Sequence, residues 1–127
     1  MFAHRSGLPT NTRQLGPWGE KQAKRYLEKQ GFKCLDTNYR CKSSELDLIM
    51  VDPEGVITFV EVKTRADEDF QAVETAVTYA KKRRMIRAAR FFIATHQLED
   101  RAFRFDVITI SGQGKQDIRY YPNAFVP

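Results

Sequence analysis

Three carboxylates and one ammonium group stand in two apolar segments near the middle of the chain. Glu45 and Asp47 precede the turn in "SELDLIMVDPEGVITFVEVK" (residues 44–63), and Glu61 and Lys63 follow it. Two neighbouring carboxylates can hold a hard divalent cation such as Mg²⁺ or Mn²⁺, with water and a substrate phosphate as the other ligands. Such a cation polarises a phosphodiester and activates bound water, while a nearby ammonium contacts the phosphate. The residue types therefore indicate metal-dependent phosphodiester chemistry.

The turn between the two segments decides whether these side chains meet. A three-residue loop, residues 53–55, puts Pro53 at the first central position of a type I turn and Gly55 at the left-handed position that follows. Asp52 then pairs with Val56, which sets the partner of every residue further along the hairpin.

In this register Asp47 lies opposite Glu61, and Glu45 lies opposite Lys63. Side chains alternate between the two faces of a strand, so all four share one face. The other face then carries Leu46, Leu48, Val60 and Val62. A two-residue loop would instead place Asp47 opposite Val60 and turn Glu61 to the other face. Opposed carboxylates repel each other unless a cation lies between them or one takes a proton.

A simpler interpretation of the same pattern stays open. The charges can be solvated side chains of an amphipathic hairpin, with Glu45 and Lys63 as an ordinary cross-strand ion pair. Against it, the same face is apolar nearer the turn, where it carries Ile49, Val51, Ile57 and Phe59. We therefore expect the acids at the mouth of a cleft.

The remaining segments predict the elements that position this hairpin. A helix is expected from Pro17, a favoured residue of a first helical turn, to the residue before Gly31. A short strand with a turn at residues 36–38 follows, and then the hairpin. A second helix, 78–97, has Thr78 as N-cap and an apolar stripe of Met85, Ala88, Ala89 and Phe92.

Two further strands are expected at residues 101–110 and 117–121, the last ended by Pro122. The order of helix, three strands, helix and two strands predicts an α/β fold, a mixed sheet of about five strands flanked by helices. We expect a flexible N-terminal arm, residues 1–15, and a single domain, residues 16–127.

Composition narrows the partners. The 127 residues carry a net charge of +5, with a pI near 9.4, which favours a polyanion such as nucleic acid. No apolar run approaches the ~20 residues of a membrane span. We therefore expect no membrane partner and a cytoplasmic location, with Cys34 and Cys41 reduced and structural.

Six basic residues gather on the second predicted helix, which has no acid before Glu99: Lys81, Lys82, Arg83, Arg84, Arg87 and Arg90. They are either a solvated helix face or a phosphate-contacting surface. Lys81 and Arg84 would share one face, and Arg83, Arg87 and Arg90 another. The nucleic-acid-binding residues that we predict are Arg40, Lys42, Lys81, Arg84 and Arg87.

The acid, the hairpin turn and the E-x-K at the end of an apolar strand resemble the PD-(D/E)-x-K nuclease superfamily. The longer stretches "GPWGEKQAKRYLEKQGFKCLDTNYRCKSSELDLIMVDPEGVITFVEVKTR", "AVTYAKKRRMIRAARFFI" and "RFDVI" resemble the bacterial YraN family, from about Gly16 to Ile108. This resemblance implies a restriction-endonuclease-like core similar to archaeal Holliday-junction resolvases, and a possible homodimer acting on a two-fold substrate.

By the same resemblance, Asp47 and Glu61 would bind Mg²⁺ or Mn²⁺, and Lys63 would be the catalytic lysine. Glu20 matches a helical acid that approaches the metal, and Glu45 matches an auxiliary acid. The chain departs from the family pattern at Ser44 and at Gln71, where the family usually has Gly.

The sequence as a whole favours a Mg²⁺- or Mn²⁺-dependent endonuclease that hydrolyses DNA phosphodiester bonds. Selectivity for branched or damaged DNA is expected only by analogy with the resolvase-like relatives. Two other functions stay open. One is a nucleic-acid-binding protein that keeps the nuclease fold without catalysis. The other is a protein-interaction subunit with a structural metal site.

Overall fold

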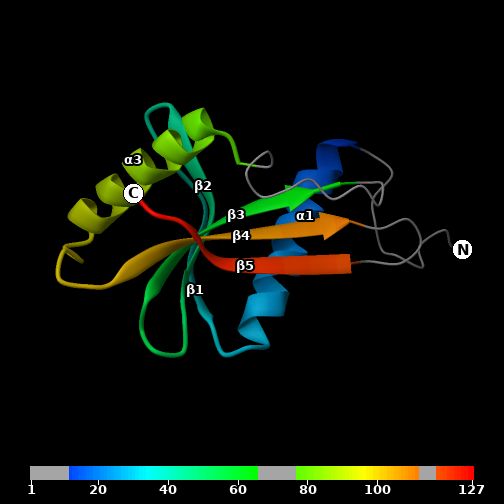
Figure 1. The fold of residues 1–127 in the computed structure, drawn as a ribbon, viewed down its shortest axis with the longest axis horizontal. Coiled ribbons are helices and arrows are strands. Elements are labelled where there is room, and N and C mark those ends of the chain that lie inside the picture. The colour runs from blue at the N-terminus through cyan, green and yellow to red at the C-terminus, as the bar shows by residue number, and fades with distance from the viewer. Residues whose placement is uncertain (1–11, 66–76, 112–116) are drawn as a thin grey trace, which may run out of the picture.

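A mixed sheet with helices packed on both faces makes up the part of the chain that the computed structural model describes, residues 12–65, 77–111 and 117–127 (Figure 1). Its elements are α1 (Thr12–Glu28), β1 (Lys33–Cys41), β2 (Ser44–Val51), β3 (Ile57–Thr64), α3 (Tyr79–Thr95), β4 (Phe103–Ser111) and β5 (Asp117–Phe125). This is the predicted order of elements.

The sheet has five strands within the described residues, in the order β1-β2-β3-β4-β5. Neighbouring strands are antiparallel except β3 and β4, which are parallel. A parallel pair needs a crossover connection, and α3 lies in the segment between β3 and β4. The predicted α/β fold, a mixed sheet of about five strands flanked by helices, is confirmed.

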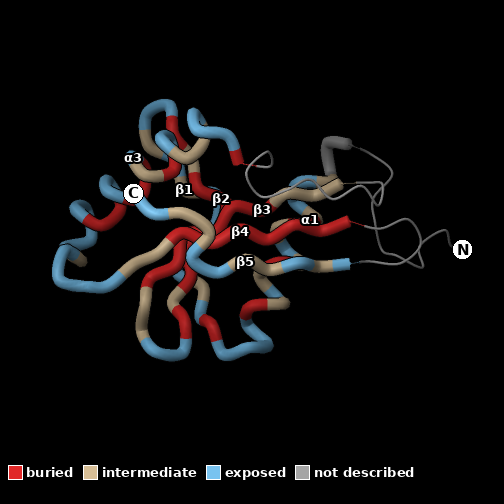
Figure 2. The backbone as a smooth tube through the Cα atoms, viewed as in Figure 1, coloured by how far each residue is buried: buried red, intermediate tan, exposed pale blue. Residues whose placement is uncertain are grey.

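Apolar side chains form one core on each face of the sheet. The α3-side core joins Met85, Ala88, Ala89 and Phe92 to Ile49, Phe59 and Phe105. The α1-side core joins Ala23 and Leu27 to Leu48, Val60, Val62 and Ile108. The central strands β3 and β4 are buried along most of their length, because both of their faces are covered (Figure 2). The predicted apolar stripe of α3 is confirmed.

The β2–β3 turn has the predicted three-residue form. The Asp52 N–H donates to the Val56 carbonyl at 2.9 Å, and the Gly55 N–H donates to the Asp52 carbonyl at 2.9 Å. Gly55 has a φ of 91°, a left-handed conformation that glycine adopts at little cost because it has no Cβ atom. The register that follows, from the pair Val51 and Ile57 to the pair Leu48 and Val60, is the predicted one.

A buried charged network anchors this turn to β4 and β5. The Arg104 guanidinium donates to Asp52 Oδ2 at 2.8 Å and to Asp106 Oδ1 at 3.0 Å. Asp106 is fully buried and accepts a further bond from the Tyr120 hydroxyl at 2.5 Å. Each charge is therefore paired or hydrogen-bonded, as burial requires. The alternation of residues in β4 predicted a strand but not this network.

The observed bounds of helices α1 and α3 differ from the predicted ones. α1 begins at Thr12, so Pro17 lies inside the helix. Pro17 cannot donate a backbone hydrogen bond and its ring crowds the preceding turn. The helix nevertheless continues through it, so Pro17 does not mark the helix start. α3 ends at Thr95 because Gln97 takes a φ of 55°, two residues before the predicted end. The Thr78 N-cap is confirmed by the bond from the Lys81 N–H, 3.2 Å.

Two strand predictions were wrong. No turn interrupts β1 at residues 36–38; the strand continues with a register shift between Cys34 and Asp36, and Asn38 adopts a φ of 53°. Pro122 lies within β5 and does not end it. It stands beside a register shift in that strand, where a missing backbone N–H does not break a regular ladder.

The predicted flexible arm, residues 1–15, overlaps the start of α1. Residues 12–15 belong to α1, and residues 1–11 lie outside the described part of the chain, as do Gln71 and most of the polar connection after Lys63. Within the described ranges, no helix has the length and apolar character to cross a membrane.

Candidate active site

Strands β2 and β3 separate at Asp47. Their backbone pairing ends at Leu48 and Val60, and one step further the Val62 N–H donates to Asp47 Oδ2 at 2.9 Å. The Asp47 carboxylate thus takes the N–H that a continued ladder would have bonded. This residue is only 8% exposed. The Asp47 carboxylate is therefore positioned by a backbone N–H group, whose own position does not depend on any side-chain rotamer.

The separation corrects two predictions. Leu46 packs in the α3-side core and Leu48 in the α1-side core, although strict alternation would put both on one face. Strand β2 therefore turns over at Asp47. The β2–β3 ladder also stops short of Glu45, so Glu45 is not paired with Lys63. On its other side Glu45 pairs with Arg40 of β1.

Glu61 meets Asp47 in this gap and lies between two ammonium groups. The Lys63 Nζ is 3.5 Å from Glu61 Oε2, and the Lys81 Nζ is 3.5 Å from Oε1. Glu61 is 3% exposed. Its Oε1 atom is buried without a hydrogen-bond partner, so the Lys81 contact is electrostatic only.

The pKa of Glu61 is raised to about 8, mainly by burial and next by the charge of the neighbouring Asp47 carboxylate. Lys81 and Lys63 both lower this pKa without cancelling the other effects. A protonated Glu61 donates a hydrogen bond to Asp47, which also favours the neutral form. The raised pKa thus reflects two carboxyl groups held close together in a buried site.

Glu20 reaches Asp47 from α1. Burial raises the pKa of Glu20 to about 7, followed by the charge of Asp47, whereas a side-chain hydrogen bond with Asn38 lowers it. The Glu45 carboxylate adds a smaller repulsion. Asp47 is therefore the shared neighbour of Glu20 and Glu61, and Glu45 lies close enough to Glu20 to affect its charge.

Close packing at Gly19 brings α1 to the site. A Cβ atom at Gly19 would lie 1.9 Å from Thr64 Oγ1 and 3.0 Å from Thr64 Cβ. Only glycine allows the helix to approach the end of β3 this closely, and the next residue along the helix is Glu20. Glu20 also lines a cavity of about 230 Å³, together with Lys21, Lys24 and Asn38.

The predicted nucleic-acid-binding residues divide into two groups. Lys81 belongs to the carboxylate site, as its contact with Glu61 shows. The other four are exposed: Arg40 and Lys42 at the β1–β2 turn, and Arg84 and Arg87 on α3. Arg87 donates to Ser44 Oγ at 3.3 Å, which ties α3 to the start of β2. Ser44, one of the departures from the family pattern, is thus a buried contact for an arginine.

A known protein family matches the part of the chain that contains this site. The model of the "Uncharacterised protein family UPF0102" matches residues 19–110. The chain belongs to the UPF0102 family. This is the YraN family, so the family resemblance is confirmed. The match begins at Gly19 and includes Glu20, Asp47, Glu61 and both lysines.

Curated UPF0102 proteins are similar to this chain over nearly all of its length. The protein of Myxococcus xanthus is 36% identical, covering 95% of this chain and 96% of its own. That of Alkalilimnicola ehrlichii is 39% identical, covering 94% and 95%. That of Ralstonia pickettii is 46% identical, covering 80% and 83%.

One solved structure, Pyrococcus furiosus SfsA in complex with Ca²⁺, resembles this UPF0102 chain with a TM-score of 0.39 at 14% identity. The alignment covers 84% of this chain and 63% of SfsA. Similarity at this level carries no argument about the site.

The donor set of this UPF0102 chain fits a divalent cation with few protein ligands. Among the described residues, no three Asp, Glu, His or Cys side chains form a ready metal cage. Asp47 and Glu61 supply two carboxylates, the number that Mg²⁺ commonly takes from a protein when water and phosphate complete its shell. The Glu61 Oε1 atom has no hydrogen-bond partner and only an ionic contact with Lys81, so it could serve as a ligand to such an ion.

Three members of the site had no assigned role there in the sequence interpretation. Lys81 was predicted to bind nucleic acid as part of the basic helix, not to contact Glu61. Gly19 stood beside Glu20 in "GPWGE" without an assigned role. Asn38 carried no signal, because its contact with Glu20 joins β1 to α1 across the fold.

Proposed function

We propose that this UPF0102 protein is a divalent-metal-dependent phosphodiesterase that cleaves DNA as an endonuclease. The observation that carries the proposal is the contact between the Asp47 and Glu61 carboxyl groups, both buried, beside an ammonium on each oxygen of Glu61. Replacing buried charged groups with apolar residues is often neutral or stabilising, so stability alone gives little reason to keep such a pair.

The position of this pair in the fold supports the same function. The acids lie on adjacent strands of a mixed sheet, and a third acid, Glu20, comes from the first helix. The resemblance to PD-(D/E)-x-K nucleases implies this arrangement of Asp47, Glu61, Lys63 and the helical acid. We therefore assign the sheet to the restriction-endonuclease-like type.

Asp47 and Glu61 would hold Mg²⁺ or Mn²⁺. The ion, when bound, would polarise the scissile phosphate and acidify a water ligand. Asp47 is held in place by the Val62 N–H and keeps its orientation without a bound ion. Glu20 would orient water at the open side of the site.

Lys63 and Lys81 would act on the substrate. Each Nζ lies 3.5 Å from Glu61, with its side chain 29% and 25% exposed, respectively. An ammonium that leaves this carboxylate remains beside the reacting phosphate and stabilises the charge that develops on its oxygens. Two lysines from separate elements thus place two positive charges at one carboxylate.

DNA would be recognised through its backbone. Exposed Arg40, Lys42, Arg84 and Arg87 provide positive charge around the site. Such contacts give affinity without reading the base sequence and weaken steeply with salt. Selectivity for branched or damaged DNA, a cytoplasmic location and a homodimer are parts of the proposal that rest on analogy or composition.

Cleavage assays test the proposal. Linear, nicked, flapped and four-way DNA are incubated with Mg²⁺ or Mn²⁺ and with the wild type, Asp47→Asn, Glu61→Gln or Lys63→Met. We expect cleavage by the wild type and a loss of roughly 100-fold or more in each variant. Glu54→Gln, which removes an exposed carboxylate in the turn, is the matched control. Equal cleavage by Asp47→Asn and the control would reject the assignment.

One observation favours a second function. Lys63 and Lys81 already neutralise Glu61, so the ion cluster can be complete without a metal. A DNA-binding module without catalysis would then show salt-sensitive binding that survives Asp47→Asn and Lys63→Met, and no cleavage of any substrate. A lack of binding to DNA and RNA at low salt would point to a protein-interaction subunit.

A further inference from the structure

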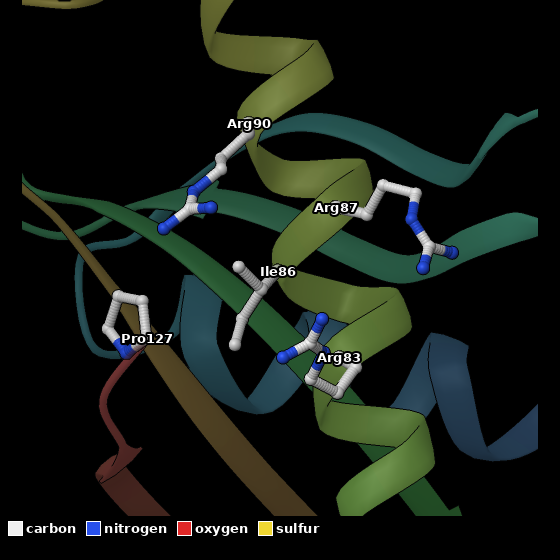
Figure 3. Close-up of a pocket in the computed structure, with 5 residues that line it drawn as sticks. All are labelled: Arg83, Ile86, Arg87, Arg90 and Pro127. Atoms are coloured by element: carbon white, nitrogen blue, oxygen red, sulfur yellow. The ribbon is translucent and has the colours of Figure 1, made fainter.

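An arginine-lined cavity lies on α3, apart from the carboxylate site. It has a volume of about 250 Å³ and is lined by Arg83, Ile86, Arg87, Arg90 and Pro127. In Figure 3 the Arg83 and Arg90 side chains flank Ile86, with Pro127 opposite, whereas the Arg87 guanidinium extends to the other side of the helix. Two guanidinium groups therefore border one small apolar floor.

The positive charge around this cavity is not balanced by acids. No ion pair joins Arg83, Arg87 or Arg90 to an acid in the part of the chain that the structure describes. Arg83 lies over the Tyr79 ring, 5.8 Å from its centroid, and Arg87 donates to Ser44. Like charges three and four residues apart on a helix repel one another. The arrangement costs stability until an anion binds.

We propose that this cavity is a phosphate-binding site for the nucleic-acid backbone, separate from the catalytic centre. The inference rests on the proposed function, because it takes nucleic acid as the partner. The planar guanidinium fork matches a phosphate bidentately. The apolar surface of Ile86 and Pro127 between the forks can accept the sugar of the same nucleotide.

Helix α3 connects this cavity to the catalytic centre. Lys81 contacts Glu61 in the first turn of α3, and Arg90 lies nine residues further along. This separation corresponds to a rise of about 13 Å, and crossing to the outer face of the helix adds up to about 10 Å. At about 3.4 Å per nucleotide of one strand, the bound phosphate is roughly four to seven nucleotides from the scissile bond.

Arg87 marks the path between the two sites. It lines the cavity, and its guanidinium reaches Ser44, the first residue of the strand that carries Asp47. A backbone running from the carboxylate site to Arg90 would pass the exposed Arg87 on α3. The cavity therefore predicts that affinity depends on the length of the DNA.

The test is a length series. Fluorescence anisotropy without divalent metal measures the affinity for DNA of about 4 to about 16 nucleotides, a range typical of single-strand sites, and for duplexes of the same lengths. The proteins are the wild type, Arg83→Gln/Arg90→Gln, and the control Arg25→Gln/Lys29→Gln. The control removes the same charge from two exposed positions, Arg25 on α1 and Lys29 directly after it, and α1 packs on the other face of the sheet.

We expect all three proteins to bind the shortest DNA alike. Beyond roughly seven nucleotides, wild type and control should gain affinity, whereas the Arg83/Arg90 variant should be about 10-fold or more weaker. Its salt dependence should also lose a slope of about two, one for each phosphate contact.

Equal affinity of the Arg83/Arg90 variant and the control at every length would overturn the inference and leave an acidic protein segment as the remaining occupant. The result does not depend on catalysis, because no metal is present. If the wild type never cleaves DNA but shows this length dependence, the endonuclease assignment fails and the phosphate site stands. If the wild type cleaves DNA but shows no length dependence, the endonuclease assignment stands and the phosphate site fails.

Discussion

The Asp47 carboxylate accepts a hydrogen bond from the Val62 backbone N–H, 2.9 Å long, at the point where β2 and β3 have stopped pairing. The bond has two effects. It satisfies an N–H that the separated strands would leave buried and unpaired. It also holds a carboxylate between Glu20 on one side and Glu61 on the other.

Asp47→Asn should therefore separate metal binding from folding. The amide oxygen still accepts from Val62, so stability without metal should match or exceed that of the wild type, since a carboxylate repulsion is lost. Asp47→Ala leaves the N–H unpaired and should cost about 1–3 kcal/mol. Thermal unfolding without divalent cations compares the three proteins. Destabilisation of Asp47→Asn as large as that of Asp47→Ala would contradict the assigned hydrogen bond.

Mg²⁺ or Mn²⁺ should stabilise the wild type but not Asp47→Asn. At a metal concentration of about 100 times Kd, binding adds about 2.7 kcal/mol to the free energy of unfolding. The Tm measured with increasing Mn²⁺ gives the effect. Glu54→Gln should respond like the wild type. A parallel rise of Tm in Asp47→Asn would place the metal elsewhere.

Lys81→Met should bind divalent metal more tightly and cleave DNA more slowly. The substitution removes an ammonium that competes for Glu61 Oε1, and a charge that acts on the phosphate. We expect roughly a fivefold gain in metal affinity, the equivalent of about 1 kcal/mol. Isothermal titration calorimetry measures it. Lys82→Met, whose ammonium lies 5.4 Å from the Phe125 ring centroid, is the control. Weaker metal binding by Lys81→Met would show that Lys81 supports the site.

Gly19→Ala should move α1 away from β3. The new Cβ would meet Thr64 Oγ1 at 1.9 Å, and such overpacking costs about 1–3 kcal/mol. Glu20 moves with the helix, so DNA cleavage should also fall. Adding Thr64→Ala should restore part of both losses. Gly16→Ala, where no atom lies within 4 Å, should be neutral or stabilising. A neutral Gly19→Ala would show that the helix packing tolerates a methyl group.

Stability should fall in acid through Asp52. Burial alone would raise the pKa of Asp52, but hydrogen bonds from the Val56 N–H, Arg104 and the Glu54 N–H outweigh it and lower the pKa below its ordinary value. A pKa lower in the folded than in the unfolded chain gives stability that is complete above the unfolded value, near 3.9. That stability is lost as the pH falls through the folded value.

Urea unfolding at a series of pH values measures this contribution. Asp52→Asn should be less stable than the wild type at neutral pH, and the difference should shrink in acid. Glu54→Gln, in the same turn, should keep the wild-type pH dependence. A constant difference between Asp52→Asn and the wild type across the acid range would exclude this linkage.

The amino-acid sequence alone determined the features that depend on near neighbours. Pro53 and Gly55 specify the turn, and the turn specifies the register as far as the pair Leu48 and Val60. Asp47 and Glu61 lie one residue beyond the end of that ladder. Thr78 specifies the start of α3, and the apolar periodicity of α3 specifies its buried face. Turn chemistry and side-chain period act over a few residues and can be read directly.

Tertiary packing decided what surrounds those two acids. The sequence predicted Glu45 beside Lys63 and Leu46 beside Leu48, but β2 turns over at Asp47 because Leu46 finds its core under α3. Lys81 and Glu20 reach the site from helices on opposite faces of the sheet. No spacing along the chain encodes that meeting, because it depends on how closely two helices pack on a sheet and on one glycine that lets α1 approach.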